Sequence, residues 1–217
     1  MVKALNNPQG ARVLVNELVG ALCLDYLGVK HPRAAVVEVP QEVIDINPEA
    51  KFRSGTPLCA GLAFGSELWQ SDPGGTVASE LLSNRQDMAG TKAVDTWIGQ
   101  NDSPTARQYR IRSSAVEPGK YDYFPVDQGY NIGSPGWDAA TLDGKHDQIV
   151  VQNMPLSLSL EEFKSALDRL REFDEAGAEH IVSQIPEEWL SGGNERKSLV
   201  RYLAARAAKA AAELEKA

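Results

Sequence analysis

The chain has 217 residues, of which 22 are basic and 30 acidic, and its formal net charge at pH 7 is −8. This charge argues against general affinity for nucleic acids or anionic membranes, which need a basic surface. Cys23 and Cys59 are too few for a disulfide framework or a cysteine-rich zinc site. No apolar run reaches the ~20 residues of a membrane span, and the first residues lack an apolar secretion signal. We therefore expect a cytoplasmic protein.

The first part of the chain has the pattern of a small α+β region. Val2–Leu5 is a short apolar run typical of a strand, and Ala11–Leu27 carries leucines at i+4 spacing, which predicts a helix that stops at Gly28. Glu17 falls on an apolar side of this helix, where an unpaired carboxylate is costly. Lys3 is the nearest candidate cation. The alternative is a half-buried helix on which Glu17 meets solvent.

Two further strands are predicted before the strongest linker in the sequence. Ala34–Val39 and Leu58–Phe64 are apolar enough for strands, and Ser71–Gly75 is rich in glycine and turn formers. We place a boundary at this linker. It divides an α+β part from a larger, mainly helical part, residues 1–70 and 71–217.

The second part is predicted to be helical around one hairpin. Val77–Ser83 and Arg85–Gln100 are helix candidates, and a Pro-Gly turn between two β-prone runs indicates the hairpin. Tyr130–Asp147 has the composition of a loop. Three helices are expected beyond Pro155: one after a capping box of Ser159 and Glu162, one from about Ala176 to Ile185, and one from Glu195 to the end.

The hairpin brings two acidic residues toward one end. Asp102 precedes it and Asp127 follows it, and pairing about Pro118–Gly119 would set Gln108 beside Asp127. Two carboxylates at a hairpin base suit metal and phosphate chemistry. Aspartate is also common in turns for local hydrogen bonding, so this pair alone leaves both interpretations open.

Most motifs of well-known enzymes are absent from the sequence. It has no GxxxxGK[ST] loop, no GxGxxG, no GxSxG and no HExxH, and its three histidines are scattered without metal-ligand spacing. What remains is an order of charged residues that protein-kinase-like enzymes also use. That order is Lys3 on a strand, Glu17 on a helix, Asp102 in a loop after a helix, and Asp127 at the end of a hairpin.

Several unusual sequence strings strengthen the kinase interpretation of this residue order. VKALNNPQGARVLVNEL, AGLAFGS, NRQDMAGTKAVDTWIGQND, FPVDQGYNIG and IPEEWL resemble the HipA-like kinase domain family of bacteria. The resemblance extends from Lys3 to about Arg206. It implies a two-lobed protein-kinase-like α+β fold with a reduced N-terminal lobe and a mainly helical C-terminal lobe. It also implies binding of ATP with Mg²⁺.

The same resemblance implies roles for individual residues. Lys3 would contact the phosphates and Glu17 would hold it, Asp102 would lie in the catalytic loop, and Asp127 would bind the metal, with Gln108 as a further candidate ligand. The hinge that meets the adenine would be the backbone of Ala63, Phe64, Gly65 and Ser66.

The sequence departs from the family pattern at the catalytic loop and before Lys3. Gln100 stands where the family often has asparagine, Ser103–Ala106 are extra, and Arg107 occupies the place of a second metal ligand. The glycine-rich loop that precedes the lysine in such enzymes is missing from this sequence. Two interpretations follow: a kinase that phosphorylates a Ser or Thr hydroxyl, or an inactive pseudokinase-type module that binds a nucleotide or a protein partner. A helical scaffold of unrelated fold would make the string matches accidental.

Overall fold

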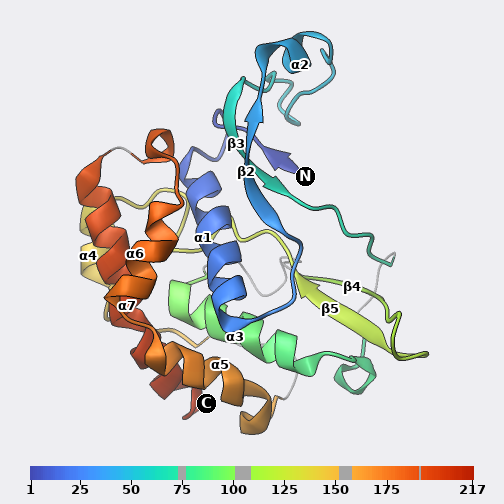
Figure 1. Cartoon of the computed structure of the whole chain (residues 1–217), viewed down its shortest axis with the longest axis vertical. Coiled ribbons are helices and arrows are strands. Elements are labelled where there is room, and N and C mark those ends of the chain that lie inside the picture. Colours follow the sequence, from blue (N-terminus) through green and yellow to red (C-terminus); the bar gives the residue numbers. More distant parts are fainter. Residues whose placement is uncertain (73–76, 101–108, 152–157, 191) are drawn as a thin grey trace.

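The chain has an α+β fold in the computed structural model, which describes residues 1–72, 77–100, 109–151, 158–190 and 192–217 (Figure 1). The strands are β1 (Val2–Lys3), β2 (Ala34–Val39), β3 (Gly61–Ser66), β4 (Tyr109–Ser113) and β5 (Tyr121–Pro125). The helices are α1 (Arg12–Leu27), α2 (Gln41–Asp45), α3 (Arg85–Ile98), α4 (Ala139–Lys145), α5 (Leu160–Glu172), α6 (Glu175–Ser183) and α7 (Gly193–Leu214). Short 3-10 turns lie at Ser79–Leu81 and Glu187–Trp189.

The first three strands form an antiparallel sheet in the order β1-β3-β2. The predicted strand Leu58–Phe64 was wrong in its bounds, because β3 begins at Gly61 and continues through Ser66. Gly65 lies within the paired region, opposite both Val2 and Ala35. A Cβ atom at Gly65 would lie only 2.9 Å from Cγ1 of Val37, so the glycine lets the strands approach closely.

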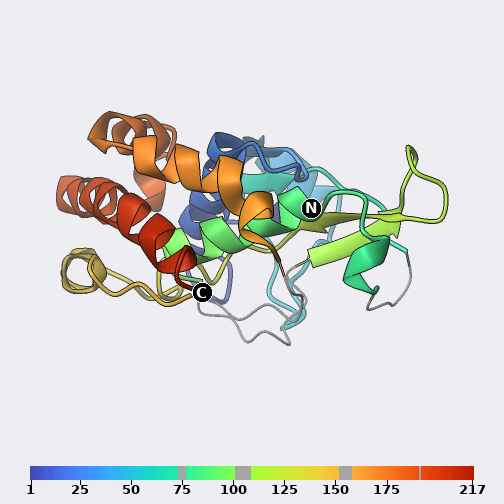
Figure 2. The same ribbon diagram turned by 90° about the horizontal axis from the view of Figure 1, so that it is seen from below.

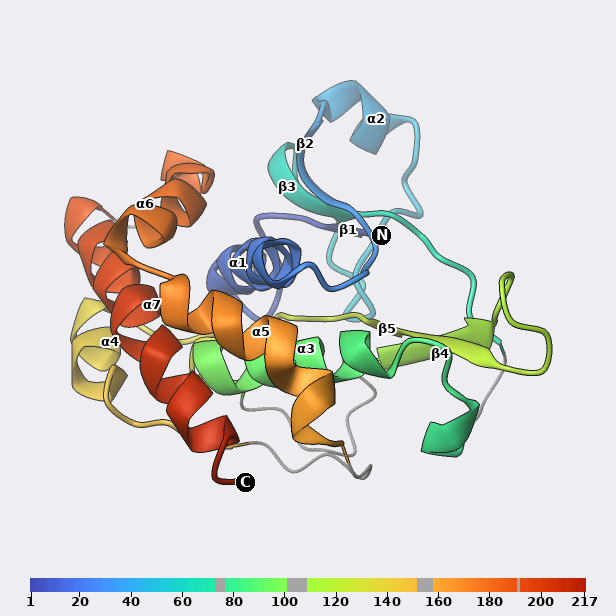
Figure 3. The same cartoon turned by 60° about the horizontal axis from the view of Figure 1, so that its bottom comes forward.

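Helix α1 lies in the middle of the molecule, between this sheet and α3 (Figure 3). Residues 13–21 are all buried, and a helix that is apolar on every side belongs in a core. Gly28 ends the helix in the left-handed conformation, at φ 72°, as predicted. Two polar residues, Asn16 and Glu17, are therefore carried into the interior on a helix that is otherwise almost wholly apolar.

Helices α4, α5, α6 and α7 pack together on one side, away from the β4–β5 hairpin (Figure 2). Helix α7 contacts α3, α4, α5 and α6, and buried side chains of α1, α3, α5, α6 and α7 form one hydrophobic core. Arg206 of α7 is 2% exposed, and its guanidinium donates to the carbonyl oxygens of Thr96 and Trp97. This satisfies carbonyl groups that the end of α3 leaves without intrahelical partners.

Three sequence predictions for the middle of the chain need correction. Val77–Ser83 forms no α-helix, only the 3-10 turn. Tyr130–Asp147, predicted as loop, contains α4, because Asp138 caps it by accepting a hydrogen bond from the Thr141 amide at 2.8 Å. The hairpin pairs Tyr109 with Pro125, so it is centred on Glu117 and not on the Pro-Gly dipeptide. In the part of the chain that the structure describes, no helix has the length and apolarity to cross a membrane.

Candidate active site

Lys3 joins two carboxylates that come from distant parts of the chain. Its ammonium donates to Glu17 of α1 and to Oδ1 of Asp127, the latter at 2.8 Å. The side chain of Glu17 is 3% exposed and that of Lys3 14%, whereas Asp127 is 56% exposed. The pairing of Lys3 with Glu17, expected from the sequence, is therefore present. The cation lies between a buried carboxylate and one that faces outward.

Burial and charge set the pKa values of the three groups. Burial raises the pKa of Glu17 to about 7 against the opposing charge of Lys3. Burial favours a lower pKa for Lys3, but the charges of Glu17 and Asp127 outweigh it and raise that pKa. Burial also acts to raise the pKa of Asp127, and the nearby Lys3 charge reverses this and lowers it. Asp127 thus stays ionised, as a metal ligand must be.

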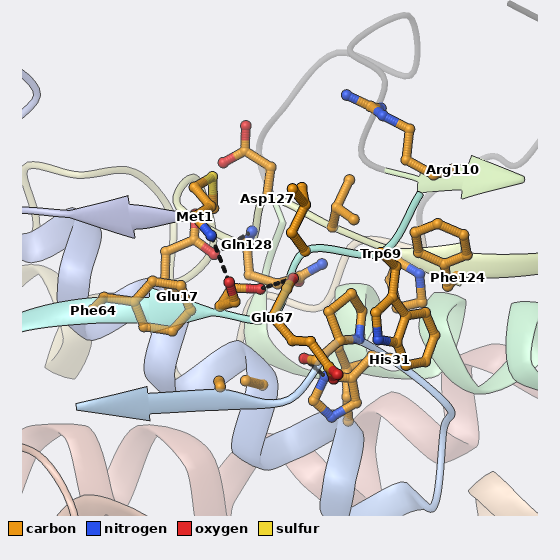
Figure 4. Close-up of a pocket in the computed structure, with 18 of the residues that line it drawn as sticks. Met1, Glu17, His31, Phe64, Glu67, Trp69, Arg110, Phe124, Asp127 and Gln128 are labelled. Atoms are coloured by element: carbon orange, nitrogen blue, oxygen red, sulfur yellow. Dashed lines mark hydrogen bonds between the residues drawn. The ribbon is translucent and has the colours of Figure 1, made fainter. Parts of the chain in front are cut away.

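A cavity of about 260 Å³ opens beside these residues. Phe64, Glu17 and Asp127 contribute to its wall, and Trp69 and Phe124 lie together at the other side (Figure 4). The Trp69 and Phe124 rings meet edge to face, with centroids 5.2 Å apart. A wall that combines aromatic rings with charged side chains suits a ligand with a flat apolar part and a charged part.

The other predicted site residues are distributed differently. Phe64 and Ser66 line the cavity, whereas Ala63 and Gly65 are buried within β3, where they pair with β2. Asp102 and Gln108 lie outside the described residues. Trp69 and Phe124 were missed, although their aromatic character just after one strand and within another was visible in the sequence.

The chain resembles a kinase of known structure. No protein-family model and no curated protein matches this chain. The crystal structure of the proinflammatory kinase CtkA of Helicobacter pylori superposes with a TM-score of 0.57 at 13% sequence identity, covering 99% of this chain and 88% of that one. The chain has a kinase-like fold. At this identity the likeness establishes the fold and leaves activity to be argued from the site.

The charged residues beside the cavity can be compared with what a bound Mg²⁺ requires. Among the residues that the structure describes, no group of three or more acidic, histidine or cysteine side chains is placed to hold a metal by itself. Mg²⁺ needs no such group, since it is usually held by one or two carboxylates together with substrate phosphates. The ionised, half-exposed Asp127 beside the cavity meets that requirement.

Proposed function

We propose that the chain is a HipA-like kinase that binds ATP with Mg²⁺ and transfers a phosphoryl group to a Ser or Thr hydroxyl. The observation that carries the proposal is the contact of Lys3 with both Glu17 and Asp127 beside a cavity that Phe64, Trp69 and Phe124 help to line. Phosphoryl transfer needs fixed positive charge on the phosphates and a carboxylate for the metal. The kinase-like fold and the sequence strings that resemble HipA-like domains support the same conclusion.

We assign one role to each of the site residues that the structure describes. Glu17 holds the ammonium of Lys3, which binds the α- and β-phosphates, and Asp127 holds Mg²⁺. Trp69, Phe124 and Phe64 enclose the adenine. Mg²⁺ held by Asp127 would supply positive charge that offsets the charge of the phosphates.

The transfer itself conserves atoms and charge in the usual way. The acceptor oxygen forms a bond to the γ-phosphorus while the bond to the ADP oxygen breaks, and the hydroxyl proton passes to a base. By resemblance that base is Asp102, outside the described residues. We also propose a two-lobed arrangement in a bacterial cytoplasmic protein, with residues 1–70 as a reduced N-terminal lobe and 71–217 as the C-terminal lobe. The acceptor hydroxyl would belong to the chain itself or to a protein substrate.

An inactive, pseudokinase-type binding module is the second candidate. Arg107 favours it, because an arginine replaces the amide that would hold a second metal ion in better-known kinases. Such a module could bind a nucleotide or a protein partner, and its nucleotide-binding form differs from the kinase only in turnover.

Thermal unfolding with ATP tests whether the chain binds the nucleotide and the metal. A ligand at 100 times its Kd adds about 2.7 kcal/mol to the free energy of unfolding. Because the proposal gives the metal a part in binding, millimolar ATP should raise Tm more with Mg²⁺ than with EDTA. Asp127→Asn should abolish the metal-dependent part. Asp168→Asn on α5 is the matched control, since its carboxylate is also 56% exposed, and it should behave as the wild type.

Transfer from radiolabelled ATP to the chain itself or to added protein then tests for activity. Incorporation that is lost in Asp127→Asn and in Asp102→Asn supports the kinase. A metal-dependent rise in Tm without incorporation supports the inactive module. A Tm unaffected by millimolar ATP with Mg²⁺ rejects the kinase and the nucleotide-binding form of the inactive module.

A further inference from the structure

Asn16 is a fully buried polar residue near the candidate site, at 0% exposure. It stands next to Glu17 on α1 but lies outside the cavity wall. Its Nδ2 donates to the carbonyl oxygens of Gly129 and Asn131, both at 2.8 Å, and its Oδ1 accepts from the indole of Trp137 at 2.7 Å. Both ends of one amide are thus used to bind the segment that follows Asp127.

That segment is held in an unfavourable backbone conformation at two points. Asp127 has φ 58° and Ile132 has φ 57°, in the left-handed region that non-glycine residues rarely adopt. The conformation is unfavourable for residues other than glycine and persists where neighbouring contacts enforce it. The two carbonyl groups that Asn16 binds lie between these two residues. On the far side, the Ile132 amide donates to the carbonyl of Ile98 at 2.9 Å.

Two neighbours of Asn16 on α1 contact the same segment. Oε2 of Glu17 accepts from the Gln128 amide at 2.9 Å. Gly20, one turn later, lets the segment approach so closely that a Cβ atom there would lie 2.6 Å from Cβ of Gln128. Helix α1 therefore presents one face, made of Asn16, Glu17 and Gly20, to the segment 128–131.

We infer that Asn16 is a positioning residue for the metal-binding carboxylate, an inference that rests on the proposed function. It touches neither the cavity nor Asp127, and acts through Gly129 and Asn131. By fixing those two carbonyl groups to α1 it keeps Asp127 in its left-handed conformation, with the carboxylate directed at Lys3. Without these bonds the segment relaxes, and the carboxylate is no longer held where metal and phosphates meet.

The test compares ATP affinity with and without Mg²⁺ by calorimetry in two variants. Asn16→Asp keeps the shape and the acceptor for Trp137 but removes both N–H donors, and Asn16→Leu removes every hydrogen bond of the side chain at similar size. Groups that orient metal ligands from outside the coordination sphere are worth about 10–100-fold in metal affinity. We expect the enhancement of ATP binding by Mg²⁺ to fall about tenfold or more in both variants. The Kd measured in EDTA should stay within about twofold.

Leu214→Ala is the control for a merely structural effect. Leu214 is 3% exposed at the C-terminal end of α7, so its truncation lowers Tm through the helical core. It should leave the enhancement by Mg²⁺ unchanged. An unchanged enhancement in Asn16→Asp overturns the inference, and so does an equal loss in Leu214→Ala.

Hydrogen exchange of the wild-type chain adds a test that needs no variant. If α1 and the segment form one unit, the Gln128 amide exchanges as slowly as the amide of Leu18 in the middle of α1. Exchange of Gln128 by separate, faster opening overturns the role of Asn16 while leaving the proposed function intact. If the wild-type chain binds ATP with the same affinity with and without Mg²⁺, the proposed function is overturned directly, and the role of Asn16 with it.

Discussion

Lys3 and Asp127 are 124 positions apart in the sequence and form an ion pair of 2.8 Å. One lies on the first strand and the other follows the last, and Glu17 of the central helix binds the same ammonium. No local segment can form this contact by itself, so the charges of the site come together only when the sheet, α1 and the hairpin are packed.

The coupling of Lys3 with Glu17 should be measurable by a double-mutant cycle. Lys3→Met leaves a buried carboxylate without its cation, and removing one partner of a buried pair costs about 3–5 kcal/mol. Glu17→Gln in the same chain removes the unpaired charge. We therefore expect the double variant to be more stable at pH 8 than Lys3→Met alone, with a coupling energy of about 1–3 kcal/mol from urea unfolding.

Arg33 and Glu67 provide the exposed counterpart for this cycle. Their side chains are 87% and 39% exposed, and exposed pairs typically couple by less than about 1 kcal/mol. The same cycle with Arg33→Met and Glu67→Gln should give a value near zero. Equal couplings for the two pairs would show that burial does not strengthen the Lys3–Glu17 contact.

The sequence was sufficient for features that rest on local patterns. Leucines at i+4 spacing and Gly28 defined α1, and the apolar side of that helix marked Glu17 as a residue in need of a cation. Two β-prone runs around a turn predicted the hairpin. The capping box at Ser159 is also present. Each of these depends on residues a few positions apart, where helix and turn periodicity apply.

Features set by distant partners were not predicted. Glycine is typical of turns, but Gly65 pairs with a strand on each side and is therefore part of β3. The importance of Asn16 depends on the carbonyl groups of Gly129 and Asn131, more than 110 positions away, and no spacing rule connects them. A polar residue directly beside Glu17 within an apolar helix was the single available sign.

Gly20→Ala should destabilise the chain although alanine is the better helix former. The substitution gains about 1 kcal/mol of helix propensity. Against this, the new Cβ would lie 2.6 Å from Cβ of Gln128 and 2.7 Å from Nδ2 of Asn131, and such overpacking costs about 1–3 kcal/mol. We expect a net loss in urea unfolding, together with weaker enhancement of ATP binding by Mg²⁺.

Gly144→Ala in α4 is the matched control, because a Cβ atom there meets nothing within 4 Å. It should stabilise the chain by up to about 1 kcal/mol. If both alanine variants gain stability equally, the close approach of α1 to the segment after Asp127 is not the reason for the glycine at position 20.

Asp95 should make the chain less stable as the pH rises. It is 9% exposed on α3, and its Oδ1 has no hydrogen-bond partner among the described residues. Burial raises its pKa from 3.8 to about 7, so between these values the folded state binds more protons than the unfolded state. Stability attributable to this group is full below pH 3.8 and falls with rising pH by at most about 1.4 kcal/mol per unit until the folded pKa is passed.

Asp95→Asn removes this titration. The Tm of the variant, relative to the wild type, should therefore increase from pH 5 to pH 8. Tyr123, whose pKa burial raises, stays neutral over this range and does not contribute. Tm curves that run parallel from pH 5 to pH 8 would show that the Asp95 carboxyl titrates alike in the folded and unfolded chains.

The stability that Glu162 contributes should be lost as the pH falls, the opposite of the Asp95 dependence. Its Oε2 accepts from the Ser159 amide at 2.6 Å and from Nη2 of Arg85 at 3.2 Å, which joins the start of α5 to α3. The Arg85 hydrogen bond is the main cause that lowers the pKa of Glu162 from 4.5 to about 2. The stabilisation is therefore present above pH 4.5 and lost as the pH falls toward 2.

Glu162→Gln should cost about 1 kcal/mol at pH 7, and the difference from the wild type should vanish near pH 2. Glu161→Gln, an exposed change in the same helical turn, should alter Tm little at either pH, and a cost equal to that of Glu162→Gln would assign the effect to the helix dipole instead of the Arg85 contact.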